Sequence, residues 1–126
     1  MASKVRIGTS VQPLEQVSSG DPFYIDSDFG KRSSVNFEYT PSGQTFNNST
    51  VLCSNSSSTS IASNIEFIGV KHMSGAAAYI SLDGGTTNHI YIPVGSSVSL
   101  IVVEGTNVHV KGSSSSKTKL TVTTGT

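Results

Sequence analysis

The chain is predicted to be all-β: an antiparallel β-sandwich, of jelly-roll or immunoglobulin-like type, with an extended N-terminal arm. Apolar and polar residues alternate with a period of two in many short segments, as is typical of half-buried strands. Turn residues separate these segments at intervals of about 8–12 residues, the spacing found in sandwiches and small barrels. The sequence contains no amphipathic helical pattern longer than one turn.

The first 20 residues are predicted to form the arm. A short strand is possible around Val5 and Ile7, but nothing in this segment buries a face periodically, and a Ser-Ser-Gly break follows at 18–20. Such a terminal segment is either loose or docked on a neighbouring molecule. Residues 21–126 are then predicted to form one sandwich domain, since the length suits a single domain.

Residues 21–60 contain strand patterns and one long polar tract. A short strand is possible at 23–25, and the alternation over 35–39 predicts another strand. A Pro-Ser-Gly turn follows at 41–43, and 46–53 is a further candidate strand. Residues 54–60 are nearly all Ser, Asn and Thr, so they cannot bury apolar surface and are predicted to be a loop or linker. This tract is also interpreted as a soft boundary within the sandwich domain.

The C-terminal half is predicted to contain six strands, at 65–72, 78–82, 90–94, 98–103, 108–111 and 120–123. Turn residues at 83–86 and 95–97 predict that the strands between 75 and 103 form one antiparallel meander, against which the rest packs. Pro93 cannot donate a ladder hydrogen bond, so it should end its strand or place it at a sheet edge.

Strand parity divides the apolar residues of this half between two faces. Ile65 and Phe67 are assigned to the core face, while six residues fall on the opposite face by parity: Ile68, Val70, Tyr79, Tyr91, Ile101 and Val103. On a solvated sheet they would form an unusually apolar patch. Either residues 21–53 of the same chain or another subunit must cover them. These six, together with Val5 and Ile7, are the candidate interface residues.

The composition favours a chain that works within an assembly over the alternative, a surface of ordinary polar loops. Charged residues make up only 13% of the chain and the formal net charge is zero, so charge repulsion contributes little to solubility. A nucleic-acid partner is not expected, because that requires a basic stripe. No apolar run of about 18 residues predicts a membrane span, and residues 1–14 lack the apolar core of a signal peptide, so synthesis in a cytoplasm is expected.

No catalytic, cofactor or metal site is predicted. His72, His89 and His109 lie in separate strands or turns without metal-ligand spacing. The single Cys53 cannot form an internal disulfide and is predicted to be a buried structural thiol. The acidic segment 26–30 is interpreted as an Asx-turn rather than a calcium loop, because it lacks a closing glutamate and flanking helices. The chain is therefore not expected to be an enzyme.

Three pieces of sequence carry a resemblance to a known group of proteins: AAYISLDGG at 77–85, IPVGSSVSL at 92–100, and VHVKG at 108–112 followed by LTV at 120–122. In these strands and turns the C-terminal half resembles small β-sandwich structural proteins of tailed bacteriophages, such as capsid decoration or cement proteins. The resemblance implies a non-enzymatic virion subunit without cofactors, made in the host cytoplasm. Its partners would be copies of itself and the major capsid protein or another virion protein.

Two functions are therefore kept. The first is a capsid decoration or cement subunit, with a trimer favoured, that stabilises the head by multivalent contacts. The alternative is a receptor- or glycan-binding module of a tail or fibre. That alternative would use exposed aromatic rings beside polar groups, namely Tyr79, Tyr91, Asn88 and Asp83.

Overall fold

The computed structural model describes residues 4–11, 14–15, 18–22, 24–25 and 33–126. All regular secondary structure in these residues is β, and the strands pair antiparallel, which confirms the predicted fold class. The described residues include no helix that is long and apolar enough to cross a membrane. The chain forms two compact units, Lys4–Tyr39 and Thr40–Thr126, so the division lies near residue 40 rather than at residue 20 or in the polar tract 54–60.

The first unit is a β-ribbon, called the N-terminal ribbon below. It contains β1 (Val5–Val11), β2 (Leu14–Glu15), β3 (Tyr24–Ile25) and β4 (Ser33–Tyr39). β1 pairs with β4, and β2 pairs with β3. A turn at Ser18 and Asp21 lies between the two halves, because the Asp21 N–H donates to the Ser18 carbonyl at 3.1 Å. The strand expected over 35–39 was placed in the sandwich domain; it instead pairs with the predicted arm, which alternation alone could not reveal.

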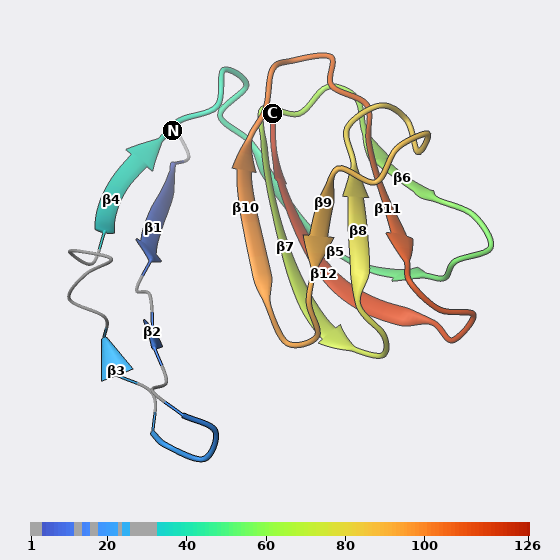
Figure 1. The fold of residues 1–126 in the computed structure, drawn as a ribbon. Helices are drawn as coiled ribbons and strands as arrows, with labels where there is room; N and C mark the ends of the chain where they lie inside the picture. The colour runs from blue at the N-terminus through green and yellow to red at the C-terminus, as the bar shows by residue number, and fades with distance from the viewer. Residues whose placement is uncertain (1–3, 12–13, 16–17, 23, 26–32) are drawn as a thin grey trace. The chain divides into compact units, whose positions relative to one another are not determined.

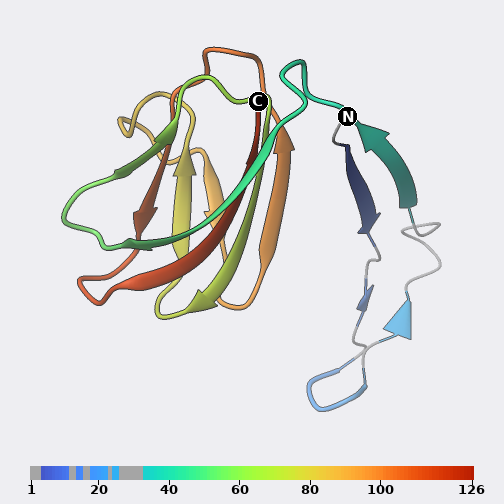
Figure 2. The same ribbon diagram turned by 180° about the vertical axis from the view of Figure 1, so that it is seen from behind.

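The second unit is a sandwich of two four-stranded sheets (Figure 1). Sheet I has the order β10-β7-β12-β5 and sheet II the order β6-β11-β8-β9. Seen from behind, the long strands of sheet I form the near layer (Figure 2). The strand bounds are β5 Phe46–Cys53, β6 Thr59–Ala62, β7 Phe67–Ser74, β8 Ala78–Ser81, β9 Ile90–Ile92, β10 Ser97–Ile101, β11 Val108–Gly112 and β12 Thr118–Gly125.

The strand order is that of an eight-stranded jelly roll. The chain changes sheet at every connection from β5 to β12 except one, the β8–β9 connection, which joins two neighbours within sheet II. Two four-stranded sheets filled alternately in this way define the jelly roll among antiparallel sandwiches. Of the two sandwich types predicted from the sequence, the structure thus has the jelly roll.

The predicted single meander over 75–103 was wrong in its last strand. β8 and β9 pair as expected, but β10 pairs with β7 in the other sheet. The turn between β9 and β10 makes the crossing: the Ser96 N–H donates to the Pro93 carbonyl at 3.1 Å, and Gly95 has a φ of 78°. Turn residues show where a chain reverses but not which sheet receives the next strand. β9 is an edge strand that ends just before Pro93, as predicted.

The core lies between the two sheets and draws on both. Its buried members are Cys53, Ile65, Ile68, Val70, Ala78, Ile80, Ile92, Val108, Val110, Leu120 and Val122. Ile68 and Val70 therefore belong to the core, and their assignment to the opposite face was wrong. Phe67 alternates with them and lies on the outer face of sheet I. It is only 3% exposed there, and its ring meets Phe46 edge to face, with centroids 6.1 Å apart. The prediction failed because β7 begins at Phe67. Ile65 lies before the strand, so it does not determine which face each residue of β7 occupies.

Candidate functional site

The N-terminal ribbon has one apolar and one charged face. Val5 pairs with Tyr39 and Ile7 with Phe37, and directly paired residues of antiparallel strands point to the same side. These four residues form what we call the ribbon's apolar face. Phe37 is 41% exposed. One side of the ribbon thus carries three apolar side chains and a tyrosine.

The opposite face of the ribbon is held by ion pairs. Arg6 lies directly across from Glu38 and approaches its carboxylate at 3.0 Å, and Lys4 approaches the same carboxylate at 3.6 Å. The hydrogen bond from Arg6 and the charge of Lys4 lower the pKa of Glu38. Since all three side chains are exposed, the pairs add little stability. They form in the same register that places Ile7 beside Phe37.

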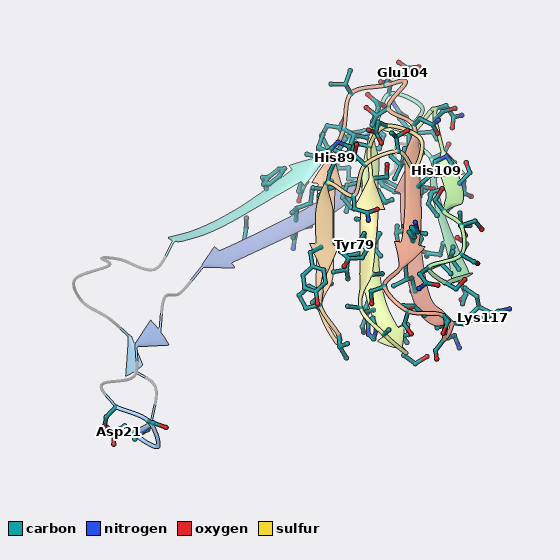
Figure 3. The ribbon with its side chains drawn as sticks, turned by 45° about the vertical axis from the view of Figure 1, so that its right-hand side comes forward. Asp21, Tyr79, His89, Glu104, His109 and Lys117 are labelled. Carbon is teal, nitrogen blue, oxygen red and sulfur yellow. The ribbon has the colours of Figure 1, made fainter. Side chains whose placement is uncertain are left out.

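The outer face of sheet II carries Tyr79, which is labelled in Figure 3, in a row with two further large side chains. Tyr79 on β8 pairs with Tyr91 on β9 on one side and with Lys111 on β11 on the other. The two tyrosine rings are tilted against each other, with centroids 5.6 Å apart. Tyr91 is 56% exposed, and Tyr79 is half-buried beneath its neighbours. The row places two aromatic rings, tilted against each other, beside a cation.

The loop between β8 and β9, residues 82–89, is closed by a polar network. The buried Ser81 hydroxyl donates to the Asp83 carboxylate at 2.7 Å and accepts from the Gly85 N–H at 2.9 Å. The same carboxylate accepts from the Thr87 N–H at 2.9 Å. At the end of the loop, His89 Nδ1 accepts from the Leu82 N–H, and its Nε2 lies 3.9 Å from Asp83. Asn88 is exposed in this loop.

The ionised form of Asp83 stabilises this loop, so its loss at low pH should be measurable. Hydrogen bonds from Ser81 and Thr87, helped by the nearby His89, lower the pKa of Asp83 from 3.8 to about 2. An acidic group with a lowered pKa stabilises the fold at pH values above its ordinary pKa. This stabilisation is lost as the pH falls to the pKa of the folded state. We expect Asp83→Asn to be less stable than wild type at about pH 6, with the difference shrinking between about pH 4 and pH 2.

Urea unfolding followed by circular dichroism across that pH range provides the measurement. The lowered pKa of Glu38 is common to both proteins, so it cancels in the comparison. A stability difference that stays constant from about pH 6 to pH 2 would show that ionisation of Asp83 does not matter to the loop.

His72 is buried at one end of the sandwich and joins two turns. Its Nδ1 accepts from the Gly95 N–H at 3.0 Å, so the proton resides on Nε2. Nε2 faces the carbonyls of Gly75 at 3.1 Å and Ala76 at 3.0 Å. The Thr118 hydroxyl donates to the Ala76 carbonyl as well, at 2.8 Å. Backbone groups thus occupy both ring nitrogens, and His72 acts as a structural bridge.

The structure separates the eight interface candidates into four places. Ile68 and Val70 are in the core, Tyr79 and Tyr91 contact each other on the outer face of sheet II, and Val5 and Ile7 lie on the ribbon's apolar face. Ile101 is the last residue of β10, and Val103 lies in the turn that follows. Both side chains are exposed. The single apolar patch expected from parity is therefore not formed. Sequence reasoning also missed the Ser81 and His89 contacts of the 82–89 loop, although the Asp-Gly-Gly turn within it was identified.

The remaining chemically reactive candidates have structural surroundings. Cys53 is buried at the end of β5, as predicted, and burial raises the pKa of its thiol, which disfavours the reactive thiolate. His109 meets the Ser58 hydroxyl at 3.0 Å. Within the described ranges, no group of three or more His, Cys, Asp or Glu residues could hold a metal ion. The segment 26–30, interpreted as an Asx-turn, lies outside the described residues.

Comparison with known proteins gives no relative: no family model, no curated protein and no solved structure matches the chain.

Proposed function

We propose that the chain is a non-enzymatic structural subunit of a virion, a capsid decoration or cement protein that binds by surface contact. The observation that carries the proposal is the ribbon's apolar face. A two-stranded ribbon is at best marginally stable alone in water. An apolar face of Val5, Ile7, Phe37 and Tyr39 gains stability when a partner surface covers it. The partner that fits a virion subunit is the major capsid protein or a neighbouring virion protein.

The sandwich suits a mechanical role. Its core is buried between two sheets, and among the described residues no buried side-chain nitrogen or oxygen lacks a hydrogen-bond partner. Such a core loses no stability to unpaired polar groups, each of which would be costly. Each subunit then contributes a modest contact through its ribbon. Many copies on one shell would make the total attachment strong, since linked binding events raise the effective concentration.

Binding to shells tests the proposal directly. The double variant Ile7→Asn/Phe37→Ser removes apolar character from the ribbon, and Asn36→Ser changes the opposite face as a matched control. We expect the double variant to bind heads assembled without this protein at least about tenfold more weakly, because each lost apolar contact weakens association by about 1 kcal/mol. Co-sedimentation with those heads measures it. Unchanged binding of the double variant would refute the role of the ribbon.

The tyrosine row supports a second candidate, a glycan-binding module of a tail or fibre. Tyr79 and Tyr91 present ring surface on sheet II beside Lys111, and aromatic rings with polar neighbours are suited to sugar faces. The ribbon variant Ile7→Asn/Phe37→Ser and a variant of the tyrosine row, Tyr91→Ala, distinguish the two functions. For a decoration subunit, Tyr91→Ala leaves binding to heads unchanged. Loss of attachment to host-cell polysaccharide on Tyr91→Ala, with Ile7→Asn/Phe37→Ser unaffected, would favour the glycan-binding module instead.

A further inference from the structure

The free edge of β5 lacks the features that usually protect the edge of a sheet. β5 (Phe46–Cys53) lies at one end of sheet I, and among the described strands β12 is its hydrogen-bonded neighbour. Edge strands in natural proteins are usually short, bent by bulges, or marked by charged residues or proline. β5 has eight residues, none of them charged or proline, and its register with β12 is unbroken. Its outer side therefore offers backbone groups to another strand.

The other three edges of the sandwich are less open. β9 has three residues and is followed by Pro93. β6 has four residues and a register shift against β11. β10 is uncharged like β5 but has only five residues. On β5, residues 47–50 and Leu52 are all exposed. By length and exposure, β5 is the edge best suited to pair with a further strand.

The side chains of β5 are complementary to a second copy of the same strand. Antiparallel pairing about a two-fold axis at Ser49 places Phe46 opposite Leu52 of the second copy, and Asn48 opposite its Thr50. All four residues point to the outer face of sheet I, because alternate residues of a strand share a face. Leu52 is 54% exposed and would gain an aromatic neighbour. No like charges would meet across the new pair of strands.

We infer that two copies of the chain pair through their β5 strands, joining both sheets I into one continuous eight-stranded sheet. The contact is isologous and closes on itself, as is usual for two-fold dimers. It predicts a dimer and not the trimer favoured from the sequence. The inference does not depend on the proposed virion role. Because strand edges alone bury less than the roughly 1,200–2,000 Å² of a standard interface, the dimer should dissociate on dilution.

A disulfide at the two-fold axis tests the register. Ser49→Cys would bring the two introduced thiols opposite each other, with Cα atoms about 4.5–5.5 Å apart, a distance that a disulfide spans. We expect a covalent dimer of the 13.1 kDa chain on a non-reducing gel after mild oxidation of the full-length protein. Wild type, whose Cys53 is buried, and Ser99→Cys on the β10 edge are the controls and should remain monomeric on the gel. No cross-link with Ser49→Cys, or an equal one with Ser99→Cys, would overturn the inference.

Charged substitutions on the β5 edge test the same contact without a covalent cross-link. Asn48→Lys/Thr50→Lys places lysines directly opposite lysines across the two-fold axis, where like charges repel. We expect dimerisation to weaken by about tenfold or more in light scattering over a concentration series. Ser99→Lys, which adds a charge to the β10 edge, should leave it unchanged. Thermal unfolding of both variants shows that the sandwich itself is intact. A wild-type monomer at all concentrations, or a dimer that only Ser99→Lys weakens, would refute the pairing.

Discussion

Shortening Ile68 to alanine is expected to lower the free energy of unfolding by about 2–5 kcal/mol. Its side chain is 0% exposed and lies in β7, which is hydrogen-bonded to both β10 and β12. Removing three carbons there loses burial against sheet II and leaves a cavity, because the two flanking strands hold the backbone in place. The chain has no tryptophan, so urea unfolding followed by circular dichroism is the suitable measurement.

Ile101 supplies the matched control, since the same substitution removes the same atoms. It lies on the neighbouring strand β10 and is 45% exposed, so Ile101→Ala is expected to cost less than about 1 kcal/mol. Strand parity in the sequence had grouped these two isoleucines on one face. Equal losses for the two variants, or a larger one for Ile101→Ala, would restore that grouping and contradict the core described above.

The face on which each residue of a strand lies could be predicted from the sequence where only one face of the strand is apolar. Val108 and Val110 alternate with His109 and Lys111, and both valines are buried as expected. In β7 both faces carry apolar residues, so a shift by one residue gives an equally plausible pattern. Ile65 is buried, but Ile65 and Glu66 both precede the strand. Counting the alternation from Ile65 therefore assigned Phe67 to the wrong face.

Partners far apart in the sequence could not be predicted, because alternation describes a strand and not its neighbour. The sequence predicted the strands at 46–53 and 98–103, but not that β5 and β10 would be the two edges of one sheet. For the same reason the arm was separated from β4, with which β1 pairs over seven residues. At the candidate surfaces, the sequence identified Tyr79 and Tyr91 as one outward-facing pair. It also identified Val5 and Ile7 as interface candidates, but not Phe37 and Tyr39 beside them, because the ribbon's apolar face exists only once β1 and β4 are in register.

Replacing Gly75 with alanine is expected to lower the free energy of unfolding by about 2–4 kcal/mol, for two separate reasons. Gly75 has a φ of 88°, a conformation that residues with a side chain rarely adopt. A Cβ at this position would also collide with the carbonyl oxygen of Lys117 and lie 3.0 Å from the Cα of Thr118. These are backbone atoms at the start of β12, so they cannot turn aside as a flexible side chain would.

The collision would also reach the His72 bridge. Moving the Gly75 backbone away from Lys117 would disturb the contact between the Gly75 carbonyl and His72 Nε2, which is 3.1 Å in the native fold. Gly105→Ala isolates the contribution of contact from that of conformation: Gly105 has a φ of 92°, but nothing lies within 4 Å of its added Cβ. We expect Gly105→Ala to cost only about 1 kcal/mol in the same urea experiment. If the two variants were equally destabilised, the packing of the β7–β8 turn against β12 would contribute nothing, and strain in the backbone alone would account for both losses.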